Sequence, residues 1–147
     1  HTNGVDMSNQ RKETSYVIVH SSHTTPKENL DVKDLDTEHR KQGLFSCAFH
    51  YIIKRDGTVQ EGRDILLSGV HVEGNPNITN KNSIGICLIG GKSIENTPDC
   101  NYTFKQYTSL VNLVKELKQK YTVSVVGHRD VTNSILCPNF DVSELLT

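Results

Sequence analysis

Three side chains in this 147-residue sequence have metal-binding chemistry, and two of them stand at the ends of apolar runs. His20 closes the run YVIVH, His128 closes the run VSVVGH, and Cys137 follows nine residues after His128. Two imidazoles and one thiolate leave a fourth position open on a tetrahedral zinc ion, which is typical of catalytic rather than structural zinc sites. Each residue alone has a simpler interpretation, because strand-end histidines are often structural and cysteines in apolar loops are usually just buried.

The two histidines require strands that end at one edge of a sheet. Residues 16–20 are apolar and β-branched, and a polar stretch follows them, so they predict a buried strand that feeds a loop. Residues 122–128 repeat this pattern, and residues 84–91, IGICLIGG, form the most hydrophobic run and predict a central strand. Open α/β sheets commonly bind ligands at the carboxyl ends of their strands, which is where both imidazoles would lie.

A hairpin and a long loop complete the predicted β-structure. Residues 49–63, FHYIIKRDGTVQEGR, contain two β-rich runs around an RDG turn, which is typical of a two-stranded hairpin. Strand alternation would place Phe49 and His50 on opposite faces of that hairpin. Residues 68–83 are rich in Gly, Asn and Pro and lack periodicity, so they predict a long loop, and loops of that length are often functional.

Three segments predict helices that would cover the sheet. Residues 31–42 predict a surface helix with Gly43 after its end, and residues 141–146 predict a short terminal helix. The longest helix is predicted over residues 103–121, with Thr103 as N-cap and an apolar face made of Phe104, Tyr107, Leu110, Val111, Val114 and Leu117. Strands and helices alternate after the hairpin, so we expect a single α/β domain in which helices flank a mixed central β-sheet.

Composition limits the classes of function. The chain has 35% hydrophobic and 22% charged residues and a net charge of −1, which argues against a nucleic-acid partner and for one ordinary globular domain. No run approaches the ~18 apolar residues of a membrane span, and we read no export signal, so we expect no membrane partner and four free cysteine thiols. We expect residues 1–6, which precede Met7, to be a cloning remnant or disordered, and residues 7–147 to form the domain.

Four segments occur in an order that resembles a known family. They are SYVIVHSSHT, FHYIIKRDGTVQEGRD, NSIGICLIGG, and GHRDV followed by CP. This combination is similar to the type-2 N-acetylmuramoyl-L-alanine amidases, including T-seven-type phage endolysins and, more distantly, the peptidoglycan-recognition proteins. The similarity runs from about Tyr16 to Phe140. It implies an amidase fold, a Zn²⁺ ion held by His20, His128 and Cys137, and hydrolysis of the bond between N-acetylmuramic acid and L-alanine in peptidoglycan.

Two positions depart from the catalytic pattern of that family. The resemblance places a tyrosine where this chain has Phe49 and a lysine where it has Ile135. Both family side chains would help to stabilise the oxyanion or to protonate the leaving amine, and loss of one such hydrogen bond commonly slows catalysis by ~10²–10³. His23, Tyr51 and Lys54 are the alternative sources of a proton.

Several other polar residues have an expected place near the site. The resemblance implies that His71 lines the substrate groove, so we assign it to substrate binding together with Asn82, whose simpler role is to orient the loop backbone. His50 is expected in the core or behind the metal ligands. His39 is expected to be solvated or to pack on its helix.

Three hypotheses follow. The first is a zinc-dependent phage endolysin, monomeric, made in the cytoplasm of the bacterial host and acting on the cell wall at lysis. The second is a pseudo-amidase that keeps zinc and binds muropeptide or a protein partner such as phage RNA polymerase, which Phe49 and Ile135 favour. The third is a cysteine hydrolase that uses Cys137 with His128, which requires an exposed, reactive thiolate.

Overall fold

A five-stranded mixed β-sheet forms the centre of the computed structural model, which describes residues 10–132 and 136–146. The strand order is β3-β2-β4-β1-β5. Neighbours pair in parallel except at the β2–β3 hairpin, which is antiparallel. The strands are β1 (Tyr16–Ser21), β2 (Tyr51–Ile53), β3 (Val59–Glu61), β4 (Ser83–Leu88) and β5 (Ser124–Gly127).

β4 lies at the centre of the sheet, as its sequence predicts. All six of its residues are buried, because the sheet is covered on both faces. A strand covered on both faces is apolar along its whole length rather than alternating, which explains the continuous hydrophobic run. Its register with β1 sets His20 opposite Cys87.

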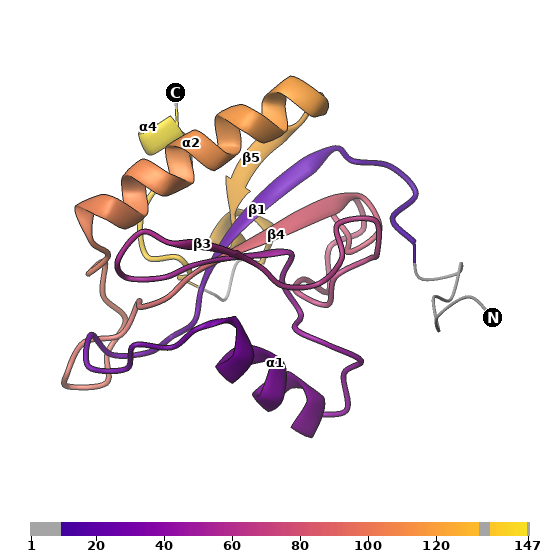
Figure 1. Cartoon of the computed structure of the whole chain (residues 1–147). Coiled ribbons are helices and arrows are strands. Elements are labelled where there is room, and N and C mark those ends of the chain that lie inside the picture. Colours follow the sequence, from indigo (N-terminus) through magenta and orange to yellow (C-terminus); the bar gives the residue numbers. More distant parts are fainter. Residues whose placement is uncertain (1–9, 133–135, 147) are drawn as a thin grey trace.

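Helices lie on both sides of the sheet (Figure 1), which confirms the prediction of a mixed central sheet flanked by helices. α2 (Phe104–Lys120) and α4 (Val142–Leu146) pack on the face that presents Val17, Val19 and Ile86. α1 (Val32–Lys41) packs through Leu35 on the opposite face, where the buried residues Ile52, Cys87 and Ile89 lie. One turn, α3 (His128–Val131), follows β5 directly. No helix of the described chain is long and apolar enough to cross a bilayer.

Capping residues define the start of both long helices. The Asp31 side chain accepts a hydrogen bond from the Asp34 backbone N–H, and the Asp34 side chain accepts one from Asp31 in return. Thr103, the predicted N-cap of α2, forms the same reciprocal pair with Gln106. These pairs satisfy backbone donors that a helix terminus leaves free.

The buried face of α2 differs from the predicted one at its first turn. Phe104 was predicted to be apolar core but is 84% exposed, because the capping pair turns Gln106 inward instead. Gln106 is fully buried, and its Nε2 donates to the carbonyls of Ile53 and Ile89 at 3.1 and 2.9 Å. Ile53 is the last residue of β2 and Ile89 follows β4, so Gln106 joins the helix start to the ends of two strands.

We expect Gln106→Leu to lower the free energy of unfolding by about 2–3 kcal/mol, because it removes buried hydrogen bonds while keeping a similar volume. Chemical denaturation measures this change. Gln119→Leu, the same substitution on the exposed face of α2, is the control and should alter stability by no more than ~0.5 kcal/mol. Equal effects of the two substitutions would contradict the role given to Gln106.

Candidate metal centre and active-site pocket

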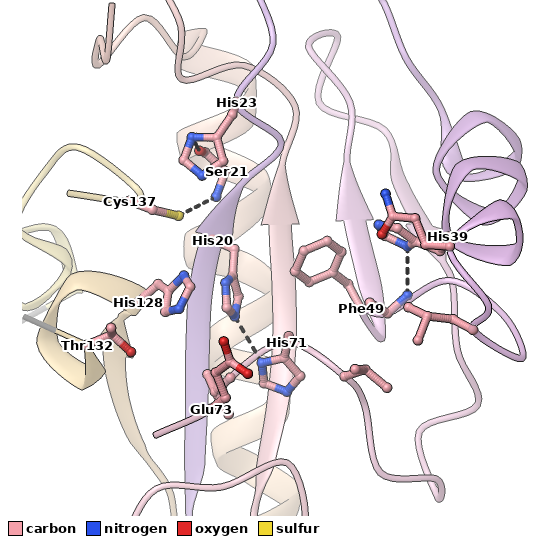
Figure 2. Close-up of a pocket in the computed structure, with 15 residues that line it drawn as sticks. His20, Ser21, His23, His39, Phe49, His71, Glu73, His128, Thr132 and Cys137 are labelled. Atoms are coloured by element: carbon pink, nitrogen blue, oxygen red, sulfur yellow. Dashed lines mark hydrogen bonds between the residues drawn. The ribbon is translucent and has the colours of Figure 1, made fainter. Parts of the chain in front are cut away.

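A pocket of about 570 Å³ opens beside the carboxyl ends of β1 and β5 (Figure 2). Five of the seven histidines of the sequence line it, namely His20, His23, His39, His71 and His128. The other lining residues are Ser21, Gln42, Leu44, Ala48, Phe49, Val70, Val72, Glu73, Thr132 and Cys137.

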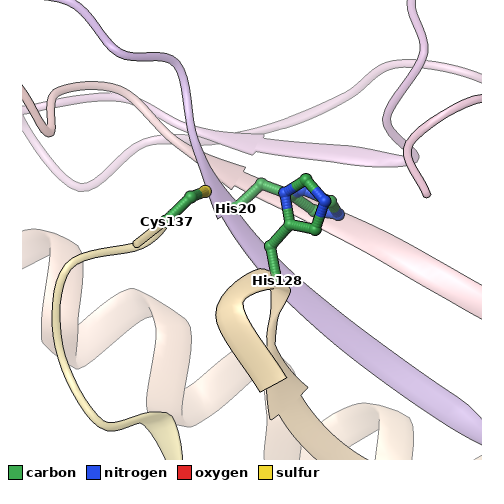
Figure 3. A group of neighbouring side chains, drawn as sticks. All are labelled: His20, His128 and Cys137. Carbon is green, nitrogen blue, oxygen red and sulfur yellow. The ribbon is translucent and has the colours of Figure 1, made fainter. Parts of the chain in front are cut away.

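The structure brings the three predicted metal ligands together. The donor atoms of His20, His128 and Cys137 all lie within 4.8 Å of one another (Figure 3). β1 and β5 are parallel neighbours with Val19 opposite Gly127, so the next residue of each chain segment is a histidine at the same edge. The two imidazole centroids are 4.5 Å apart. This cluster could hold a metal ion, and the role of each residue as a ligand stays a prediction.

Cys137 is buried and its sulfur has a polar neighbour. The backbone N–H of Ser21 donates to Cys137 Sγ at 2.9 Å, and the residue is only 1% exposed. Burial raises the pKa of the Cys137 thiol, and the bond from Ser21 only partly opposes that shift. A thiolate near neutral pH therefore needs a cation beside it, and a buried thiol is a poor free nucleophile. The geometry disfavours the cysteine-hydrolase hypothesis. All four cysteines are free thiols, as predicted.

Burial favours the neutral form of both imidazoles in the cluster. Burial, followed by repulsion from neighbouring histidines, holds the pKa of His20 well below its usual value. Burial also lowers the pKa of His128. Metal ligands must offer a lone pair, so neutral imidazoles and a cation-stabilised thiolate together fit a divalent transition-metal ion.

Phe49 lies directly beside this cluster. Its ring centroid is 5.0 Å from that of His20 and 5.9 Å from that of His39. β2 begins only at Tyr51, so Phe49 and His50 precede the regular strand and their alternation stays a prediction. Both rings approach His71, with centroid distances of 6.4 Å for Phe49 and 6.0 Å for His50.

Comparison with known proteins decides the family. A family model described as N-acetylmuramoyl-L-alanine amidase matches residues 10–140. The chain belongs to this amidase family. The endolysin of Enterobacteria phage T3 is 42% identical over 133 residues, which span 90% of this chain and 85% of that protein.

Solved structures agree with this assignment. The amidase LysC from Clostridium intestinale has a TM-score of 0.73 and 26% identity, with 90% of this chain and 83% of that one covered. Bumblebee PGRP-SA shares the fold, with a TM-score of 0.71, 24% identity, and 88% of this chain and 78% of that one covered. The expected resemblance to phage endolysins and to the recognition-protein fold is confirmed.

Phe49 gives the amidase pocket an apolar ring at the position where the resemblance implies a tyrosine hydroxyl. Ile135, where the resemblance implies a lysine, lies outside the described residues. Of the alternative proton sources, His23 lines the pocket, whereas Tyr51 and Lys54 do not. Tyr51 packs against the core under α2, on the other face of the sheet.

The amidase pocket also contains residues that the sequence did not point to. Glu73 contributes the single carboxylate among the described lining residues, and its side chain points into the pocket (Figure 2). Glu73 is exposed. In the sequence, only its place two residues after His71 in the long loop could have indicated that Glu73 lies near the site. A loop without periodicity does not reveal which of its side chains turn inward. His39 lines the same pocket, and its Nδ1 accepts a hydrogen bond from the Ala48 backbone at 3.0 Å.

Two further expected residues have structural contacts. The Asn82 side chain accepts from the Thr79 backbone and donates to the Asn77 carbonyl, so it orders the loop and does not line the pocket. A part for Asn82 in substrate binding stays a prediction. His50 is buried behind the pocket, where its Nδ1 accepts from the Gly85 backbone at 3.0 Å, and burial lowers its pKa to about 4.

Proposed function

We propose that this amidase is a zinc enzyme that hydrolyses the amide bond between N-acetylmuramic acid and L-alanine in peptidoglycan. The observation that carries the proposal is the cluster of His20, His128 and Cys137 at the wall of a pocket, in a chain of the amidase family. Three ligands of this kind leave one position for the reaction. Bound zinc would polarise the scissile carbonyl and lower the pKa of water.

The protein must also move a proton from the attacking water to the leaving amine. Glu73 is suited to this step, because a carboxylate can accept the proton from water and release it to the nitrogen of L-alanine. The reaction then ends with a free lactyl carboxylate and a free amine. Phe49 forms an apolar wall beside His20 and supplies no hydrogen bond to the oxyanion. We assign the binding of the substrate beside this wall to His71, which lines the pocket.

The relative in phage T3 is an endolysin, which supports a place for this protein in phage lysis. In this proposal the enzyme is a monomer that resides in the cytoplasm of the bacterial host until lysis and then acts on the cell wall. Peptidoglycan or its muropeptides are its partner.

Phe49 favours a second candidate function. A chain that lacks the hydroxyl beside its metal cluster could retain zinc and bind muropeptide without rapid turnover. Phage RNA polymerase is a protein partner of this second kind, supported only by the resemblance to the T-seven-type endolysins.

We expect the purified protein to contain one zinc ion per chain and to clear suspensions of bacterial sacculi. Clearing should release new amino groups on L-alanine without new reducing sugar ends, because the amide and not the glycan is cut. A chelator should stop the reaction and lower the melting temperature, because the ion binds the folded form, and added zinc should restore both. Turbidity, amino-group release and metal analysis measure these changes.

Two cysteine variants test the ligand set. Cys137→Ser should lose most of the zinc, whereas Cys100→Ser, which alters an exposed free thiol, should keep it. Full zinc occupancy in Cys137→Ser would exclude the proposed site.

We expect Phe49→Tyr to raise turnover by roughly ten- to a thousand-fold, because one oxygen is added where a donor can stabilise the transition state. Zinc content should not change. Phe104→Tyr, at an 84% exposed position on α2, is the matched control and should leave turnover unaltered. If the unaltered enzyme already turns over rapidly and Phe49→Tyr does not raise its turnover, another group stabilises the transition state. If both forms are inert yet bind soluble muropeptide, the second candidate function replaces the first.

We expect Glu73→Gln to lower turnover by about 10²–10⁴, because the amide cannot carry the proton between water and amine. Muropeptide binding and zinc content should persist, since the substitution keeps the size of the side chain. Glu95→Gln, at an exposed loop position, serves as control. Full turnover in Glu73→Gln would remove Glu73 from the reaction.

A further inference from the structure

We propose that His71 is a positioning residue which, with Ser83, holds His20 in the tautomer whose Nδ1 lone pair faces the metal site. The inference rests on the proposed zinc function. It concerns a hydrogen-bonded row of side chains, Ser83, His71 and His20, that runs from the amino end of β4 to the carboxyl end of β1.

Proton positions along this row follow from its innermost member. Ser83 is fully buried, and its Oγ donates to the Thr79 carbonyl at 2.6 Å. A carbonyl oxygen can only accept, so the single hydroxyl proton of Ser83 is committed there. Ser83 Oγ therefore presents a lone pair to His71 Nε2, which lies 3.4 Å away. Nε2 must be the protonated nitrogen of His71.

The tautomer of His71 determines that of His20. A neutral imidazole protonated on Nε2 has a bare Nδ1, which accepts a hydrogen bond. His71 Nδ1 lies 2.9 Å from His20 Nε2, so His20 Nε2 donates across this contact. The remaining nitrogen of His20, Nδ1, then carries a lone pair. Figure 2 shows that nitrogen on the side of the ring that faces His128 and Cys137.

The fold leaves a slot for the His71 ring. A Cβ atom on Gly85 of β4 would lie 2.9 Å from His71 Cγ, and one on Gly69 would lie 2.6 Å from its Cδ2. Real Cβ atoms do not approach other atoms so closely, so only glycine fits at these positions without a shift. The Asn80 side chain accepts from the backbone N–H groups of His71 and Val72 at 2.9 and 3.1 Å, which fixes the loop above the slot.

A fixed tautomer matters because a metal binds a lone pair. An imidazole with its proton on the wrong nitrogen must exchange that proton before it can bind. Residues that fix a metal-binding histidine through its second nitrogen typically change metal affinity or activity by ~10–100-fold when they are replaced. This assignment explains why His71 contacts His20, a proposed metal ligand, and does not serve substrate binding alone.

Two substitutions of similar shape distinguish the hydrogen-bond acceptor role of His71 from its role in packing. His71→Asn can place an amide oxygen where Nδ1 lies, and His71→Leu places a methyl group there. We expect His71→Leu to weaken zinc binding by ~10–100-fold in competition with a chelator, and His71→Asn to retain most of the affinity. Equal weakening by both variants would assign His71 a packing role and overturn the proposal.

Nitrogen-15 NMR of the histidine rings reads the tautomer directly in the full chain, with and without zinc. We expect His20 to be protonated on Nε2 alone in the unaltered protein and to populate both tautomers in zinc-free His71→Leu. Ser83→Ala should weaken the preference of His20 for the tautomer protonated on Nε2. Ser109→Ala, which removes a hydrogen bond from Ser109 on α2 to the Gly57 carbonyl, should leave that preference unchanged. If His71→Leu does not fold, the unaltered protein and Ser83→Ala decide the question.

The two proposals fail differently. A chain that binds no zinc but keeps His20 protonated on Nε2 would overturn the zinc function and, with it, the use of this tautomer. A chain that binds zinc with His20 protonated on Nδ1 would overturn the positioning role alone.

Discussion

Parallel pairing of β1 with β4 and β5 is the constraint on which the rest of the structure depends. Parallel strands end at the same edge, so two segments separated by about a hundred residues deliver His20 and His128 to one place. A parallel sheet needs cover on both faces, and α1 and α2 supply it from opposite sides. The pocket opens where that cover ends. Catalytic geometry and core packing therefore follow from the same pairing.

Burial then sets the chemistry of the site. Histidines placed against the sheet lose solvent, which favours their neutral forms and keeps their lone pairs available. The same burial raises the pKa of the Cys137 thiol, so a thiolate there would need a cation beside it.

The sequence predicted the parts of this molecule that local patterns encode. Strand ends located His20 and His128, capping residues located α2, and a continuous apolar run located β4. The prediction that Phe104 is buried was wrong, because helical spacing does not show how a capping pair orients the first residues of a helix. Glu73 and the contact between His71 and His20 could not be predicted, because loop conformation depends on partners far along the chain, such as Ser83 and Asn80. Family resemblance supplied the missing tyrosine position at Phe49, which no physical pattern in this chain marks.

The three predicted metal ligands come from the first strand, from the turn after the last strand and from the segment before α4. An ion held by all three would act as a cross-link between the two ends of the domain. α4 and the chain before it could not peel away from β5 without releasing Cys137, so local opening of the C-terminal segment would become as costly as loss of the ion. The C-terminal end of the domain would then resist proteases only while the metal site is intact.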